Sequence, residues 1–176
     1  MTTDARQLVA EAVAAAHGEI VGRVRLQKMF YLLEQLGLES GLRYTYHHYG
    51  PFSRELDEAV EAAKATSGVV EEIRCRAADG APFSVFKTHA AAPRTIGRLP
   101  VEDAGPLIEK MIAVPSTIIE LAATIHWLVH RESVADWEIE LRRRKGAKTE
   151  RGRTARAIDL LRSLGLEAPA SRPAAP

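Results

Sequence analysis

Two histidines with helical spacing are the side chains most suggestive of chemistry in this sequence. His126 and His130 are four residues apart within an apolar segment that predicts a helix, so both imidazoles would lie on one helix face, where a metal ion can be held. No glutamate follows His126 in the zinc-protease pattern, and the surrounding residues are typical of a core helix. We therefore expect neither a metal nor a cofactor at this pair.

The other candidate catalytic groups have no partners in the sequence. His47 and His48 are adjacent, so in a strand they would face opposite sides. Cys75 is the single cysteine and has no activating neighbour. A Gly-rich phosphate-binding loop is absent, because Gly50 precedes Pro51, whose nitrogen carries no hydrogen to donate. These observations predict a protein without enzymatic activity.

Apolar spacing predicts the elements that must position these residues. The helical period is clearest at 23–36, where Leu26, Met29, Phe30 and Leu33 form one stripe. The aromatic segment 44–49 predicts an extended stretch closed by Gly50 and Pro51, and the turn at 78–82 predicts a β-hairpin over 69–88. Helices are expected near 4–17, 23–36, 53–66, 102–113, 116–131, 134–144 and 150–164.

The predicted fold class is mainly α (α+β), a compact domain of about six or seven helices with one β-hairpin. The 176 residues suit a single domain, which we place at 1–166, and the Pro/Ala-rich residues 167–176 predict a disordered tail. The lone cysteine fits a reducing compartment, and no apolar run approaches the roughly 20 residues that span a bilayer. We expect a soluble, cytoplasmic protein.

Nucleic-acid binding has to be weighed, because the order helix, helix, helix, hairpin in the N-terminal half is that of a winged helix. The helix starting at Ser53 would be the recognition helix, yet it carries four acidic side chains against Arg54 and Lys64. A negative helix opposes phosphate binding. A winged-helix-like transcriptional regulator is therefore the alternative that we disfavour.

Positive charge is concentrated near the C-terminus. Residues 142–176 carry ten basic and three acidic side chains. This run is a possible nucleic-acid contact, and the competing interpretation is a solvated helix end, where the helix dipole favours cations. The candidate contacts are Arg142, Arg143, Arg144 and Lys145.

Two segments at a set separation carry a recognisable pattern. A helix bearing Leu26, Gln27 and Lys28 is followed about twenty residues later by Tyr49, Gly50, Pro51 and Ser53 at a helix start. Pro51 fixes one dihedral angle and Ser53 can cap the following helix. Gln27 and Lys28, beside the apolar stripe, are placed to hydrogen-bond carbonyl groups of that turn. The motif therefore predicts a structural role.

Over residues 20–66 this pattern resembles the YwgA-like and Panacea (SocA-type antitoxin) superfamily. Arg25 departs from it, because family members more often carry lysine there, and the basic segment from Arg142 has no counterpart. The resemblance implies a non-catalytic interaction protein, with a protein partner that is a cognate toxin.

An acidic helix would suit such a partner, since complementary charge speeds association and selects partners. The competing interpretation is a solvated surface without a partner. The candidate partner-binding residues are Glu55, Asp57, Glu58, Glu61, Tyr46 and His48.

Overall fold

The computed structural model describes residues 4–169, which fold into seven α-helices and several short antiparallel strands. The helices are α1 (Ala5–Ala15), α2 (Arg23–Gln35), α3 (Arg54–Thr66), α4 (Val101–Ile112), α5 (Ser116–His130), α6 (Trp137–Lys145) and α7 (Arg153–Ser163), with a 3-10 turn η1 (Gly146–Thr149) after α6. The strands are β1 (Glu19–Val21), β2 (Thr45–His47), β3 (Gly50–Phe52), β4 (Val70–Cys75), β5 (Pro82–Lys87), β6 (Thr95–Ile96) and β7 (Leu99–Pro100).

The predicted helices are confirmed, with ends that differ by up to about three residues. Two of the helix starts have side-chain caps: Asp4 accepts a hydrogen bond from the backbone of Arg6, and Ser53 accepts one from the backbone of Leu56 at 3.2 Å. Residues 170–176, which hold most of the expected disordered tail, lie outside the described residues.

The hairpin predicted at 69–88 is present as β4 and β5, but the sequence did not reveal the strand beside it. β1 pairs with β5 in antiparallel register, which gives a three-stranded sheet of order β1-β5-β4. β1 has only three residues, too few for a recognisable alternation. The sequence predicted one hairpin, which underestimates their number, because β2 pairs with β3 and β6 pairs with β7 as well.

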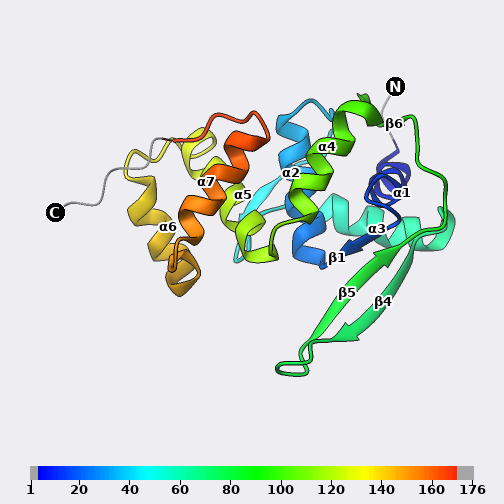
Figure 1. Cartoon of the computed structure of the whole chain (residues 1–176). Coiled ribbons are helices and arrows are strands. Elements are labelled where there is room, and N and C mark those ends of the chain that lie inside the picture. Colours follow the sequence, from blue (N-terminus) through cyan, green and yellow to red (C-terminus); the bar gives the residue numbers. More distant parts are fainter. Residues whose placement is uncertain (1–3, 170–176) are drawn as a thin grey trace.

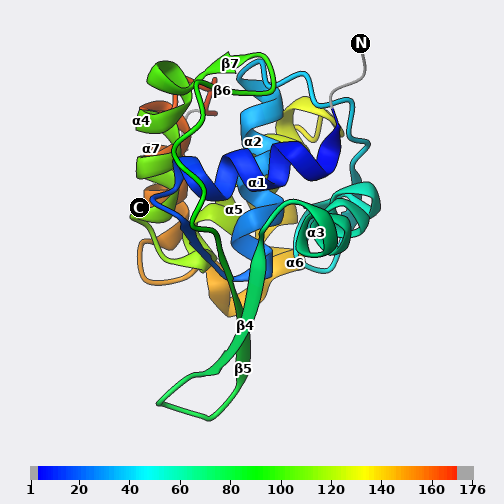
Figure 2. The ribbon, with the colours of Figure 1, turned by 90° about the vertical axis from the view of Figure 1, so that its right-hand side faces the viewer.

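Helix α2 lies at the centre of the molecule, with α1, α3 and α5 around it (Figure 2). Every residue from Arg25 to Leu33 is buried. The buried surface of this helix is therefore wider than the single apolar stripe that the sequence predicted. It includes the polar residues Arg25, Gln27 and Lys28. α5 is equally enclosed from Ile118 to Leu128. Among residues 4–169 no single helix is long and apolar enough to span a bilayer, although the bent pair α4 and α5 passes on length and composition.

The β4–β5 hairpin projects away from the helical body, while α6 and α7 lie at the opposite end (Figure 1). Its base is fastened by Glu71, which accepts hydrogen bonds from Arg23 of α2 at 3.0 Å and from Lys64 of α3 at 2.7 Å. In order of elements and of strands, the N-terminal half is a winged-helix arrangement into which the β2–β3 hairpin is inserted between α2 and α3.

Gly50 is required where the β2–β3 turn touches α5. Its φ is 91°, and a Cβ atom there would lie 2.6 Å from Oγ1 of the buried Thr124. Gly41 has a φ of 75° but has nothing within 4 Å of the same position. We expect Gly50→Ala to lower the free energy of unfolding by about 1–3 kcal/mol more than Gly41→Ala, because only Gly50→Ala overpacks a buried contact. Urea denaturation of both variants measures this difference, and equal losses would contradict it.

Candidate functional site

The recognisable motif forms a set of buried contacts between α2 and the β2–β3 hairpin. Gln27 accepts a hydrogen bond from the backbone N–H of Ser53 and donates one to its carbonyl, both at 2.9 Å. The amide of Gln27 also donates to Asp57 at 2.8 Å, and the Lys28 ammonium donates to the carbonyl of Pro51 at 2.6 Å. Leu26, Gly50, Pro51 and Ser53 are buried with them. Two adjacent side chains of α2 thus hold the hairpin and the start of α3.

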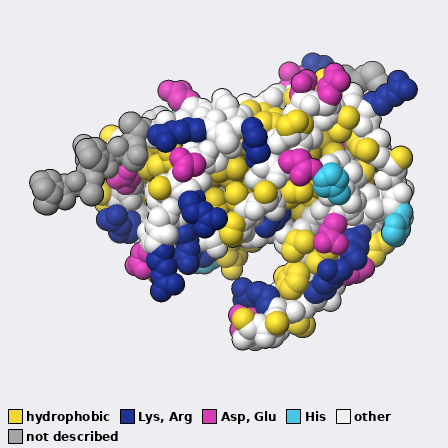
Figure 3. All heavy atoms as spheres, viewed as in Figure 1, with side chains coloured by type: hydrophobic (Ala, Val, Ile, Leu, Met, Phe, Trp, Pro, Cys, Tyr) yellow, Lys and Arg dark blue, Asp and Glu magenta, His cyan; other side chains and the backbone are white. Residues whose placement is uncertain are grey.

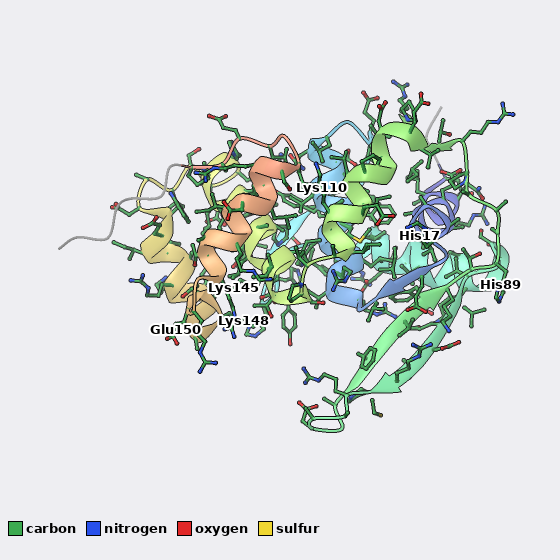
Figure 4. The ribbon with its side chains drawn as sticks, in the orientation of Figure 1. His17, His89, Lys110, Lys145, Lys148 and Glu150 are labelled. Carbon is green, nitrogen blue, oxygen red and sulfur yellow. The ribbon has the colours of Figure 1, made fainter. Side chains whose placement is uncertain are left out.

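A buried charge cluster lies on the other side of the same hairpin. Lys145 donates to Glu120 and to the carbonyl of His48, both at 2.9 Å, and its side chain is only 1% exposed. Lys148 donates to both oxygens of Glu120 at 2.9 Å. Figure 4 shows Lys145 and Lys148 close together beside η1. Lys145 therefore connects α6 both to Glu120 on α5 and to the β2–β3 hairpin.

The charges of this cluster act on the pKa of Lys28, although no hydrogen bond joins Lys28 to Glu120 or Lys145. Burial lowers the pKa of Lys28 from its usual value of 10.5 to about 8, partly opposed by the charge of Glu120 and reinforced by the charge of Lys145. Burial also lowers the pKa of Lys145, although Glu120 opposes that effect. Glu120 is thus bonded to Lys145 and Lys148, and its charge also acts on Lys28 without a direct contact.

The histidine pair is incorporated into an aromatic cluster. His126 Nδ1 lies 2.9 Å from the Tyr31 hydroxyl, and the rings of His126 and His130 lie 4.5 Å apart. Burial and the neighbouring His130 lower the pKa of His126 to about 4, so this ring is neutral near pH 7, and its Nδ1 shares a hydrogen bond with the Tyr31 hydroxyl. Within residues 4–169 no three His, Cys, Asp or Glu side chains are grouped to hold a metal ion. The positions of His126 and His130 are therefore explained by their contacts in this aromatic cluster.

The acidic side chains of α3 face cations of this same chain. Glu55 bonds Arg43, Glu58 bonds Arg54, and Glu61 bonds Lys64 at 2.8 Å and Arg23 at 3.3 Å. Asp57 accepts from Gln27 and lies 3.6 Å from Arg23. The negative face expected from the sequence is therefore largely compensated. Of the two candidates on the β2–β3 hairpin, Tyr46 is half-buried beneath the Arg144 guanidinium and His48 is exposed.

The four basic candidates near residue 142 separate into two pairs. Arg142 and Arg143 are exposed, and Arg143 bonds Glu140. Arg144 also bonds Glu140 and in addition donates two hydrogen bonds to Glu132, at 2.7 and 3.0 Å. The expectation that Lys145 is available to nucleic acid needs correction, because burial and the bond to Glu120 occupy its ammonium. The four residues are consecutive in the sequence and so were predicted to form one basic surface. In the folded helix, Arg144 and Lys145 instead face Glu132 and Glu120 of the protein body.

A cleft that the sequence did not reveal separates the β4–β5 hairpin from the body. It has a volume of about 570 Å³, and Figure 3 shows the hollow between hairpin and body. Its position could not be read from the sequence because its walls come from four distant segments. The lining residues are Val21, Gly22, Arg23, Val24, Tyr49, Arg76, Pro82, Phe83, Ser84 and Ser116.

Tyr49 is the motif residue that differs from the others. Its side chain is not enclosed, since 49% of the residue is exposed, and it lines the cleft. Lys148 lies over its ring at 4.9 Å. The remaining motif residues are buried and are used by the fold, so Tyr49 alone among them is available to a partner.

Comparison with known proteins reaches only part of the chain. Over 44 residues it is 43% identical to the uncharacterized protein YwgA of Bacillus subtilis (strain 168). That match covers 25% of this chain and 26% of the relative, and no family model matches. A YwgA-like relation is therefore supported over about a quarter of each chain, and the relative contributes no assigned activity.

The burial of Lys28 predicts a pH-dependent stability. Between about pH 8 and pH 10 the unfolded chain holds the Lys28 proton more firmly than the folded chain, so the free energy of unfolding should rise with pH by at most about 1.4 kcal/mol per unit. Above this window the effect reverses, because burial raises the pKa of Tyr31 and only the unfolded phenol ionises.

Lys28→Met should reduce that slope, whatever it does to stability at pH 7. The slope should not vanish, because Lys145 titrates in the same direction. Urea denaturation across the window measures it for both proteins. Lys110→Met, which removes an exposed lysine bonded to the Ser163 carbonyl, is the matched control and should keep the wild-type slope. An unchanged slope in Lys28→Met would contradict the assigned burial effect.

Proposed function

We propose that this chain is a non-catalytic protein-binding module that acts as the antitoxin of a toxin–antitoxin pair, binding its partner directly. The antitoxin role follows from the resemblance of the paired motifs to the Panacea superfamily. The protein-binding role is supported by the internal hydrogen bonds of the side chains that could otherwise take part in catalysis. Gln27, Lys28 and His126 satisfy internal hydrogen bonds, so the residues most capable of chemistry stabilise the fold.

The observation that carries this proposal is the exposure of Tyr49 in the cleft. An aromatic side chain left half-exposed beside Val21 and Phe83 offers an apolar surface that a partner side chain can bury. Arg23 and Arg76 line the same cleft. Both arginines are paired within the chain, with Glu71 and Asp79, so the cleft fits a partner with an apolar anchor, the kind of side chain that interfaces place at their centre.

A winged-helix DNA-binding regulator is the second candidate, and the sheet order β1-β5-β4 favours it. Two features weigh against it. The helix α3, which would enter the groove, carries four carboxylates, and the cations beside them are occupied in ion pairs with these carboxylates. The hairpin arginines Arg74 and Arg76 bond Glu72 and Asp79 of the same hairpin, at 2.8 Å each. Contacts to phosphate would first have to break these pairs.

Coexpression tests the proposal. Each open reading frame adjacent to this gene is expressed alone and with this chain, and we expect one neighbour to arrest growth and the chain to relieve the arrest. Tyr49→Ser should abolish relief and weaken complex formation at least about tenfold, the effect of losing about 1.4 kcal/mol at a buried anchor. Ile139→Ser, a change at a similarly exposed residue on α6, is the matched control and should leave relief intact.

Two outcomes would contradict the proposal. One is the absence of any neighbour whose toxicity the chain relieves, together with salt-dependent binding to its own upstream DNA that Arg76→Glu removes. That result would favour the regulator. The other is relief that survives Tyr49→Ser but is lost in Ile139→Ser, which would move the binding surface away from the cleft. Thermal melts of both variants check that each is folded.

A further inference from the structure

The outer edge of the sheet is formed by β4, and it is exposed. In the order β1-β5-β4 this strand has a neighbour on one side only, and Figures 1 and 2 show it projecting beyond the helical body. Val70 and Ile73 on this strand are 55% and 65% exposed. Edge strands of this length usually carry a device that blocks pairing, because their free N–H and C=O groups attract another strand. The charged residues of β4, Glu71, Glu72 and Arg74, are engaged in ion pairs within the chain, whereas the exposed Ile73 at the centre of the strand favours pairing.

Hydrogen bonds of β5 establish which backbone groups of β4 are free. The N–H of Gly22 donates to the carbonyl of Ser84 at 2.8 Å, and the N–H of Thr88 donates to Gly18 at 3.0 Å. The even-numbered residues of β5 therefore bond toward β1. In an antiparallel sheet the residues of a middle strand alternate in direction, so the odd-numbered residues of β5 bond toward β4.

The register then assigns the two sides of β4. Residues 70, 72 and 74 stand opposite residues 87, 85 and 83 and bond inward. The bond from the Arg76 N–H to the Ala81 carbonyl, at 2.9 Å, continues the same alternation. The backbone groups of Glu71, Ile73 and Cys75 therefore point outward. Outside the β4–β5 ladder, no hydrogen bond among residues 4–169 involves them.

We infer that two copies of this chain associate through their β4 strands, which pair antiparallel about a two-fold axis at Ile73 and join the two sheets into one of six strands. This register places Ile73 opposite Ile73 of the second copy. The outward groups of Glu71 then meet those of Cys75 of the second copy, and the reverse. All three outward residues of each copy gain backbone partners.

The charges of β4 select this register and a second copy as the occupant. Glu72, which bonds Arg74 and Lys87 within its own chain, stands opposite Arg74 of the second copy, and the two-fold axis repeats this arrangement. Centring the pairing one residue earlier would oppose two copies of Glu72, and one residue later would oppose two copies of Arg74. Like charges directly opposite are destabilising in antiparallel sheets. Self-complementarity of this kind is what an isologous interface requires.

Projection of the hairpin makes the pairing accessible. β4 runs from the body at Val70 outward to Cys75, so an antiparallel partner would bring its own body to the far end of the shared strands (Figure 1). The two helical bodies are thereby held apart along the strand direction. The inference rests on the sheet edge and does not depend on the antitoxin proposal.

Disulfide trapping tests the register. Ile73→Cys in a Cys75→Ser background should crosslink to a dimer under mild oxidation, because residues in a hydrogen-bonded antiparallel pair have Cα atoms about 5.5 Å apart, within disulfide range. Val70→Cys in the same background should remain monomeric, since its two copies would be offset by six residues, about 20 Å. Native Cys75 should also fail to crosslink, with an offset of about 14 Å.

Sedimentation tests the association without a crosslink. We expect wild-type protein to show a concentration-dependent dimer, and Ile73→Lys to raise its dissociation constant at least about tenfold, the equivalent of about 1.4 kcal/mol. Ile139→Lys, at a residue 64% exposed on α6, should leave dimerisation unchanged. Glu72→Arg and Arg74→Glu should each weaken the dimer, and the double variant should restore it.

A protein that stays monomeric at every accessible concentration would overturn the inference. So would a dimer in which Ile73→Cys fails to crosslink, or in which Val70→Cys crosslinks equally well. Failure of toxin neutralisation leaves these readouts unaffected, because all of them use the purified chain alone.

Discussion

The β2–β3 hairpin is held by polar side chains that the core has to bury, and most of the remaining structure depends on this constraint. Gln27 and Lys28 project from the central helix α2 and satisfy backbone groups at Ser53 and Pro51. Buried amides and ammonium groups are costly unless they are paired, so both residues are committed to one position of the hairpin. The start of α3 is held with it, because Ser53 is also the cap of that helix.

The C-terminal helices are attached to the same hairpin from the other side. Lys145 reaches the carbonyl of His48 while it neutralises Glu120 on α5. Removing one member of a buried ion pair leaves an uncompensated charge, which is far more destabilising than replacing both. The hairpin is therefore held between α2 and α6 by the ammonium groups of Lys28 and Lys145, and its turn presents the exposed His48 and Tyr49.

Local patterns in the sequence were sufficient for the elements but not for the contacts between distant segments. The helical period located all seven helices, and the cap at Ser53 and the glycine turn at Gly50 were readable from residue type. Lys145 looked like one cation of a basic run because its partners, Glu120 and His48, are 25 and 97 residues away. The residues of α3 likewise predicted an acidic surface, because Arg23 and Arg43, which pair with Glu61 and Glu55, lie in other segments of the sequence.

The cleft and the exposed edge are two consequences of one projecting hairpin. In an antiparallel pair, directly opposed residues share a face of the sheet. Of the residues that line the cleft, Ser84 shares a face of the sheet with Ile73, whereas Phe83 and Val21 belong to the other face, so the cleft borders the sheet on both faces. A two-fold axis through an antiparallel strand pair is perpendicular to the sheet and leaves both copies with the same face outward. The proposed dimer would therefore relate its two clefts by a two-fold axis perpendicular to the continuous sheet. A dimeric partner that bridged the two clefts would form its second contact at a high effective concentration.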